Sequence, residues 1–253
     1  MSDPYESLRL TGKSIIVTGA ATGMGRATAK LLVERGASVT LGDVNDADGE
    51  TLLAELQAAG GKAQYVHTDV RSEADAVALV QAAVGAFGAL DGAFNNAGIG
   101  PVAPLHETSE ELWQRVIGIN MTGVFFGMKH QIAHMLEHGG GSIVNTSSLA
   151  GVKSVFAMGA YVASKHGVVG LTRAASQEYA ARGIRVNAIL PALIRTPMFD
   201  ATGPVAEELE KAQPIGRAGE PVEIAEQVAW LLSDAASYST GSLYAVDGGS
   251  NSI

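Results

Sequence analysis

The feature that most constrains the fold is an alternation of short apolar runs with longer amphipathic segments along the whole chain. The short runs are typical of buried strands, and the longer segments have the apolar spacing of helices. Strands and helices in alternating order are typical of a parallel sheet that is covered by helices on both faces. We therefore predict an α/β fold with a doubly wound parallel sheet.

The alternation assigns residue ranges to each element. Seven strands are predicted at residues 14–18, 38–42, 63–67, 92–95, 142–146, 185–189 and 243–246. Helices are predicted at residues 24–35, 48–59, 73–87, 110–137, 160–181 and 222–232. Glycines follow most of these helices, as helix C-caps commonly do.

Two regions interrupt the alternation, residues 152–159 and residues 191–220, and the second contains a short helical stretch at 205–212. Long connections in compact domains are often functional loops. Both regions follow strands, and ligands of open parallel sheets bind beyond the carboxyl ends of the strands. We expect both regions to border the functional site, with 191–220 as a substrate loop.

Composition limits the remaining possibilities. No linker divides the 253 residues, so we expect one domain over residues 1–253. The net charge of −9 and the scattered lysines and arginines argue against nucleic acid or an anionic membrane as a partner. The absence of cysteine excludes disulfides, thiolate nucleophiles and cysteine metal sites. No signal peptide or run of bilayer length is found, and we predict a cytoplasmic protein.

A glycine-rich turn follows the first predicted strand and precedes a helix. Its spacing is G-x-x-x-G-x-G, at Gly19, Gly23 and Gly25. Such a turn lets the backbone approach a pyrophosphate at a helix N-terminus, although a plain tight turn is the simpler interpretation of the glycines alone. Asp43 ends the second strand, where a carboxylate can accept hydrogen bonds from ribose hydroxyls. Because no cation stands at Ala21, Thr22 or Val44, we predict NAD and not NADP.

Tyr161 and Lys165 are four residues apart, so they share one face of the helix predicted there. A neighbouring ammonium favours the phenolate and lowers the pKa of a tyrosine, which makes it usable as an acid or base. A serine hydroxyl at Ser148 could orient a substrate oxygen. By itself, a tyrosine and a lysine at this spacing are more often surface and packing residues.

Together these residues resemble the short-chain dehydrogenase/reductase family in its compact single-domain form. The matching segments are TGAATGMG at Thr18–Gly25, NNAG at Asn95–Gly98, Asn120, Ser148 and Y-x-x-x-K at Tyr161–Lys165. The resemblance extends over about residues 10–249. It implies a Rossmann-like seven-stranded sheet and a nicotinamide cofactor.

The resemblance also implies the roles of individual residues. Tyr161 would be the general acid or base, Lys165 would lower the pKa of Tyr161 and bind the nicotinamide ribose, and Ser148 would stabilise the substrate oxygen. The backbone of Asn120 would bind a water molecule that relays protons to Lys165. The cofactor would contact Gly19, Thr22, Gly23, Met24, Gly25, Asp43, Asp69, Val70, Asn96, Ala97, Gly98, Tyr161, Lys165, Pro191, Ile194 and Thr196.

The sequence departs from the family pattern at Ala192, where the family usually has glycine after Pro191. An alanine there would carry strain if the position needs a positive φ. Relatives are commonly tetramers, so a homotetramer is expected, built on the helices that carry Asn120 and Tyr161 and on the last strand.

The predicted function is NAD-dependent interconversion of a secondary alcohol and a ketone, on a small to medium apolar substrate. The expected pocket lining is largely apolar, with Lys153 as the exception: Val152, Val155, Phe156, Met158, Leu193, Met198 and Phe199. The nearest alternative is an NADPH-dependent 3-oxoacyl-carrier-protein reductase. Two other functions fit the sequence less well. A sugar epimerase or dehydratase of the same superfamily normally needs additional C-terminal sequence. A non-catalytic nucleotide sensor would have no need to keep the four catalytic residues, Asn120, Ser148, Tyr161 and Lys165.

Two further patterns have simpler interpretations. Residues 134–138 spell H-x-x-E-H, a zinc-peptidase pattern, but they are predicted at the end of a helix, so we interpret them as a polar helix face or a subunit contact and predict no metal site. Trp113 and Trp230 are spaced from other apolar residues as on one face of a helix, so both are predicted to be core residues.

Overall fold

The computed structural model describes residues 6–200 and 203–252. Residues 1–5 of the N-terminal segment, residues 201–202 of the predicted substrate loop and residue 253 lie outside the described part of the chain.

The sheet has seven strands in the order β3-β2-β1-β4-β5-β6-β7, and every neighbouring pair is parallel. The strands are β1 Ser14–Thr18, β2 Ser38–Asp43, β3 Lys62–His67, β4 Gly92–Asn95, β5 Gly141–Thr146, β6 Ile184–Pro191 and β7 Leu243–Val246. The predicted doubly wound α/β fold is therefore confirmed. The strand order reverses between β1 and β4, and ligands bind beside such a reversal in open sheets.

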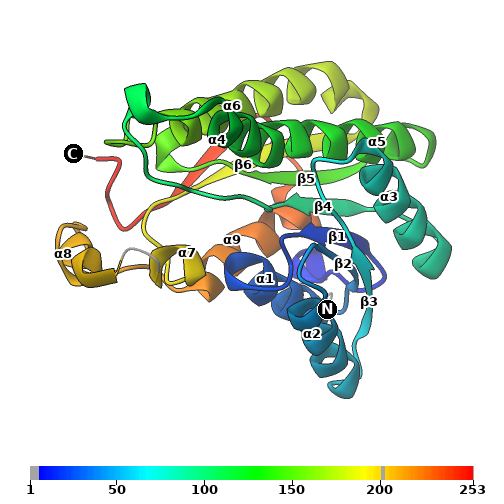
Figure 1. Cartoon of the computed structure of the whole chain (residues 1–253). Helices are drawn as coiled ribbons and strands as arrows, with labels where there is room; N and C mark the ends of the chain where they lie inside the picture. The colour runs from blue at the N-terminus through cyan, green and yellow to red at the C-terminus, as the bar shows by residue number, and fades with distance from the viewer. Residues whose placement is uncertain (1–5, 201–202, 253) are drawn as a thin grey trace.

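Helices cover both faces of the sheet (Figure 1). On one face lie α1 Gly23–Glu34, α2 Asp46–Ala58 and α9 Pro221–Leu232. On the other lie α3 Glu73–Phe87, α4 Glu110–Ile117, α5 Gly123–Glu137 and α6 Gly159–Tyr179. Each set buries its own apolar cluster against the sheet, with Leu32 and Val228 in the first and Leu79 and Val168 in the second.

The connection after β6 carries two short helices, α7 Pro197–Asp200 and α8 Ala206–Lys211. Figure 1 shows both helices on the same side of the molecule as the end of the chain. The connection follows the carboxyl end of β6, as expected for a substrate loop. Within the described ranges, no helix combines the length and the apolar character that a bilayer crossing needs.

Two expectations about the second face are wrong. The helix predicted over residues 110–137 is interrupted by a π-helical turn at Gly118–Thr122, which separates α4 from α5. Trp113 on α4 is 38% exposed and is not a core residue, whereas Trp230 packs against the core beside Tyr244. Trp113 has helical phase with other apolar residues, but the sheet does not cover that part of α4.

Candidate active site

The glycine turn between β1 and α1 is closed so tightly that it requires glycine. A Cβ on Gly25 would lie 2.0 Å from the carbonyl oxygen of Gly19, and one on Gly19 would lie 2.8 Å from the Cα of Ala97. Gly19 and Gly23 have φ values of 62° and 52°, in the left-handed region. The side chain of Asn96 donates to the carbonyl oxygens of Thr18 and Gly19. The turn thus brings bare backbone to the N-terminus of α1, which suits a pyrophosphate.

Asp43 lies directly beside this turn. Its Oδ2 accepts a hydrogen bond of 2.9 Å from the backbone N–H of Ala21, and its Oδ1 accepts one of 3.0 Å from Asn45. The Tyr65 hydroxyl donates to the backbone carbonyl of Asp43. Val44, the next residue, is 57% exposed. The carboxylate is therefore fixed at the position where the sequence predicts the adenosine ribose.

The structure also brings a cation to this region that the sequence reasoning missed. Arg26, on the first turn of α1, directs Nη1 to the carbonyl oxygen of Ala21 at 3.4 Å. Arg26 lies neither inside the turn nor directly after β2, the two places where a cation was sought in the sequence. Arg26 is one residue past the last glycine of the motif, so helical periodicity could have placed it back over the turn.

The predicted adenine-side residues follow β3. Asp69 forms two-pronged hydrogen bonds with Arg71, and the Arg71 guanidinium holds the pKa of the Asp69 carboxyl below its ordinary value. Val70 packs against α5 so closely that a Cβ on Gly123 would lie 2.8 Å from its side chain. The segment 69–70 is thus fixed against the second face of the sheet.

The structure brings the side chains of Tyr161 and Ser148 together. Ser148 precedes a short 3-10 turn, Leu149–Gly151, and its hydroxyl accepts a hydrogen bond of 3.1 Å from the backbone N–H of Ala150. The Ser148 hydroxyl also hydrogen-bonds the phenol of Tyr161. A single substrate oxygen could therefore contact both hydroxyls.

Lys165 lies one turn further along α6 and is only 3% exposed. Its ammonium donates a hydrogen bond of 2.7 Å to the carbonyl oxygen of Thr146 at the end of β5, and it lies 5.6 Å from the ring centre of Tyr161. Burial lowers the pKa of Lys165 to about 8. The Ser147 hydroxyl donates to the Lys165 carbonyl, which fixes α6 against β5.

The pKa of Tyr161 differs from the simplest expectation. Burial raises the pKa of the phenol, and the hydrogen bond with Ser148 acts in the opposite direction. Lys165 directs its ammonium to a backbone carbonyl and not to the phenolic oxygen. The lowering of the Tyr161 pKa by Lys165 therefore stays a prediction.

Asn120 lies in the π-helical turn and is completely buried. Its side chain accepts from the N–H of Ile99 and donates to the carbonyl of Ile99, both at 2.8 Å, and also donates to the Ser164 hydroxyl. A Cβ on Gly98 would lie 3.3 Å from Asn120 Oδ1 and 3.5 Å from Lys165 Nζ. The turn thus brings Asn120, Gly98 and Lys165 together, and π turns occur often at functional sites.

The segment after β6 returns to the glycine turn. A Cβ on Gly23 would lie 3.0 Å from the methyl group of Thr196, and Ile194 is buried. Among the described non-glycine residues, Ala157 alone has a positive φ, of 54°. Ala192 therefore carries no such strain, and the departure from the family pattern does not distort the loop through its φ.

The loop before α6 is tethered to the segment after β4. The backbone N–H of Ala103 donates a hydrogen bond of 2.7 Å to the carbonyl of the strained Ala157. Side chains of Met158 and Met198 come close to Gly100, beside the Tyr161 ring. Phe199, one of the predicted lining residues, is buried. Four others are exposed: Val152, Val155, Phe156 and Met198. Lys153 donates to the carbonyl of Ser250 near the end of the chain.

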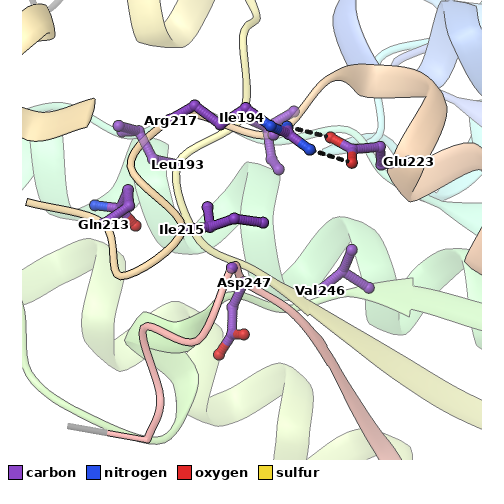
Figure 2. A pocket seen from close by; sticks show the side chains of 10 residues that line it. Leu193, Ile194, Gln213, Ile215, Arg217, Glu223, Val246 and Asp247 are labelled. Carbon is purple, nitrogen blue, oxygen red and sulfur yellow. Dashed lines mark hydrogen bonds and ion pairs between the residues drawn. The ribbon is translucent and has the colours of Figure 1, made fainter. Parts of the chain in front are cut away.

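A separate pocket lies behind the connection after β6 (Figure 2). Its lining includes Ile194, Ile215 and Val246. Figure 2 shows the Arg217 guanidinium paired with Glu223. The two hydrogen bonds of this pair are each 2.8 Å long. The hydrogen bonds from the Arg217 guanidinium lower the pKa of the Glu223 carboxyl to about 2. None of the predicted catalytic residues lines this pocket, and Ile194 is the one predicted cofactor contact among its described lining residues.

No group of three metal-ligating side chains occurs within residues 6–200 and 203–252. In the zinc-peptidase pattern, the rings of His134 and His138 stack with their centres 4.0 Å apart.

The residues present fit a nicotinamide dinucleotide. Bare glycine backbone faces a helix N-terminus, an acid ends β2, and the hydroxyls of Ser148 and Tyr161 lie beyond the carboxyl end of β5. These parts line the same edge of the sheet, on both sides of the reversal between β1 and β4. The arrangement provides an anion site, a ribose acceptor and a proton donor along one edge of the sheet.

Comparisons with known proteins agree with this geometry. The family model described as enoyl-(acyl carrier protein) reductase matches residues 19–251. The chain is 51% identical to a 2,5-dichloro-2,5-cyclohexadiene-1,4-diol dehydrogenase of Sphingobium indicum, over 96% of this chain and 99% of that protein. It is 45% identical to a cyclohexanol dehydrogenase of an Acinetobacter species, over 96% of each chain.

Solved structures have the same fold. A putative NAD(P)-dependent gluconate 5-dehydrogenase from Beutenbergia cavernae, with bound NADP at low occupancy, matches with a TM-score of 0.92 and 35% identity. The match covers 98% of this chain and 100% of that chain.

Proposed function

Because the chain belongs to the short-chain dehydrogenase/reductase family, we propose that it is an NAD-dependent oxidoreductase that interconverts a secondary alcohol and a ketone. One observation carries this proposal. The side chains of Ser148, Tyr161 and Lys165 lie close together at the carboxyl edge of the sheet that also carries the glycine turn. Enzymes of this family act on CH–OH groups and use nicotinamide cofactors.

Each residue has a distinct proposed role. The bound nicotinamide accepts or supplies the hydride. Tyr161 transfers the proton to or from the substrate oxygen, and Ser148 hydrogen-bonds that oxygen and stabilises its developing charge. Lys165 binds the nicotinamide ribose and favours the phenolate of Tyr161. Asn120 supports the proton relay through the backbone of its π-helical turn.

We propose NAD as the preferred dinucleotide. Support comes from the Asp43 carboxylate, which is fixed beside Ala21 and would repel a phosphate on the ribose 2′ oxygen. The bound NADP of the gluconate 5-dehydrogenase structure shows that a related protein accepts the phosphorylated cofactor. The proposed cofactor contacts remain those named from the sequence.

We propose a ring-shaped, largely apolar secondary alcohol as the substrate. The two relatives named above are dehydrogenases of a cyclohexadienediol and of cyclohexanol. In this chain, Met158 and Met198 approach Gly100 beside Tyr161, and thioether side chains adapt to apolar surfaces. These two thioether side chains make the surface next to the phenol apolar, which suits an apolar ring.

The second candidate is an NADPH-dependent reductase of acyl-carrier-protein substrates. The description of the matching family model favours it, and Asp43 argues against it. The two candidates differ in both cofactor and substrate, so one experiment separates them.

We further propose a single domain over residues 1–253 and a cytoplasmic homotetramer. One sheet contains all seven strands, which supports the single domain. Trp113 and Phe125, on α4 and α5, are 38% and 45% exposed, and large apolar side chains at a surface suit a subunit contact. Light scattering after size-exclusion chromatography measures the mass of the assembly. A monomer at micromolar concentration would contradict the tetramer.

The experiment for the main proposal is a panel of secondary alcohols with NAD and with NADP, followed by the absorbance of the reduced nicotinamide. We expect turnover of cyclic alcohols such as cyclohexanol with NAD. Turnover of 3-oxoacyl thioesters with NADPH, and none of cyclic alcohols, would favour the second candidate.

A further inference from the structure

The predicted ribose site contains a cation as well as an acid. Ala21 joins the two, because its backbone N–H donates to Asp43 at 2.9 Å and its carbonyl accepts from Arg26 at 3.4 Å. The Arg26 guanidinium and the Asp43 carboxylate are thus bonded to the two polar atoms of one residue. A phosphate on the ribose 2′ oxygen would meet repulsion from Asp43 and attraction from Arg26.

Arg26 is already engaged by an acid on α2. Its Nη2 lies 2.6 Å from Glu55 Oε1, and Lys30, one turn further along α1, lies 2.7 Å from Glu55 Oε2. Glu55 is therefore shared between two cations. The Arg26 side chain is 26% exposed and that of Glu55 is 43% exposed, so both can reach a ligand that arrives from solvent.

We infer that Glu55 is a specificity-determining residue for the cofactor, because it occupies the Arg26 guanidinium. The inference rests on the proposed use of a nicotinamide dinucleotide with its adenosine ribose at Asp43. It goes beyond Asp43 at the end of β2, because it assigns part of the discrimination between the two cofactors to an exposed carboxylate on α2.

The physical reason is a competition for one guanidinium. The 2′-phosphate of NADP carries between one and two negative charges near neutral pH, and arginine binds phosphates and carboxylates with the same pair of donors. While Glu55 binds Arg26, a phosphate must displace a carboxylate to gain that contact. Replacing Glu55 by glutamine removes the competing charge and leaves Arg26 beside Ala21.

The test compares the dissociation constants of NADH and NADPH, measured by nicotinamide fluorescence titration without any substrate. For Glu55→Gln we expect the ratio of the NADPH constant to the NADH constant to fall by about three- to tenfold, as for the loss of one partly exposed charge contact. The NADH constant itself should stay within about twofold. The change in ratio should shrink at high salt, because exposed charges are screened.

Two further variants show whether Arg26 carries the effect. In the double variant with Arg26→Gln, the Glu55→Gln substitution should no longer change the ratio, since the freed cation is absent. The matched control is Glu226→Gln on α9, which removes the partner of Arg35, a similarly exposed ion pair at the far end of α1. This control should leave the ratio unchanged.

An unchanged ratio in Glu55→Gln, or an equal change in Glu226→Gln, overturns the inference. A change that persists in the double variant also overturns it, because the effect would then not pass through Arg26. Failure of the proposed function gives a different result: the unmodified protein would bind NADPH more tightly than NADH, or would bind neither. The titration therefore separates the two claims.

Discussion

Replacing Lys165 by methionine separates the cost of burying an ammonium from its proposed chemical role. Lys165 is 3% exposed, and burial lowers its pKa from 10.5 to about 8. That shift corresponds to about 3 kcal/mol of destabilisation of the folded protein at pH values below 8. Methionine fills a similar volume without charge, but it leaves the carbonyl of Thr146 without its donor, which costs about 1–3 kcal/mol.

The pH dependence isolates the ammonium. Because the folded-state pKa is the lower one, the unfolded chain binds more protons between about pH 8 and pH 10.5, and the stability of the unmodified protein rises with pH there. Between about pH 7 and pH 9.5 it should gain about 2 kcal/mol relative to Lys165→Met. Turnover of the variant should fall at every pH.

The assay is urea unfolding at several pH values and one protein concentration, with Lys211→Met as the control. Lys211 is 71% exposed and lies on α8. Its replacement should leave the pH dependence of the unfolding free energy unchanged. If the difference in unfolding free energy between the unmodified protein and Lys165→Met is the same at both ends of the pH range, the assignment of a buried ammonium with a lowered pKa is wrong.

Three further substitutions test other parts of the site. Gly25→Ala should lower the unfolding free energy by about 2–3 kcal/mol and abolish NADH binding, since its Cβ would lie 2.0 Å from the Gly19 carbonyl; unaltered binding in a fluorescence titration would refute the tight turn. Ser148→Ala should reduce kcat about 100-fold and leave the NADH dissociation constant unchanged, and a kcat within about twofold of normal would remove Ser148 from the mechanism. Asp43→Asn should improve NADP binding about tenfold, and an unchanged NADP constant would contradict the proposed repulsion.

The sequence predicted the sheet well because the signal is local. The runs that became β1, β4 and β7 begin and end at the predicted residues, since each is a short apolar segment bounded by polar or glycine residues. The π-helical turn at Gly118–Thr122 was missed because it adds one residue to a turn without interrupting the apolar pattern. Its cause is tertiary: the Asn120 side chain binds both backbone groups of Ile99.

The predicted site residues came from motif order, and the structure brings most of them to one edge of the sheet. Residues that act through tertiary contacts could not be found in this way. Glu55 lies twenty-nine positions after Arg26, and only the packing of α2 beside α1 joins them. The exposure of Trp113 could not be predicted either, because an apolar helix face has the same sequence pattern whether it packs on the core or on a partner.

The most direct test of the central claim is the turnover of a cyclic secondary alcohol by Tyr161→Phe, compared with the unmodified protein at saturating NAD. The phenylalanine ring keeps the packing of α6 and removes only the hydroxyl that contacts Ser148. We predict a loss of kcat on the order of a thousandfold, with an NADH dissociation constant within about twofold of normal. Full activity of Tyr161→Phe on every substrate that the unmodified protein turns over would contradict the proposed mechanism.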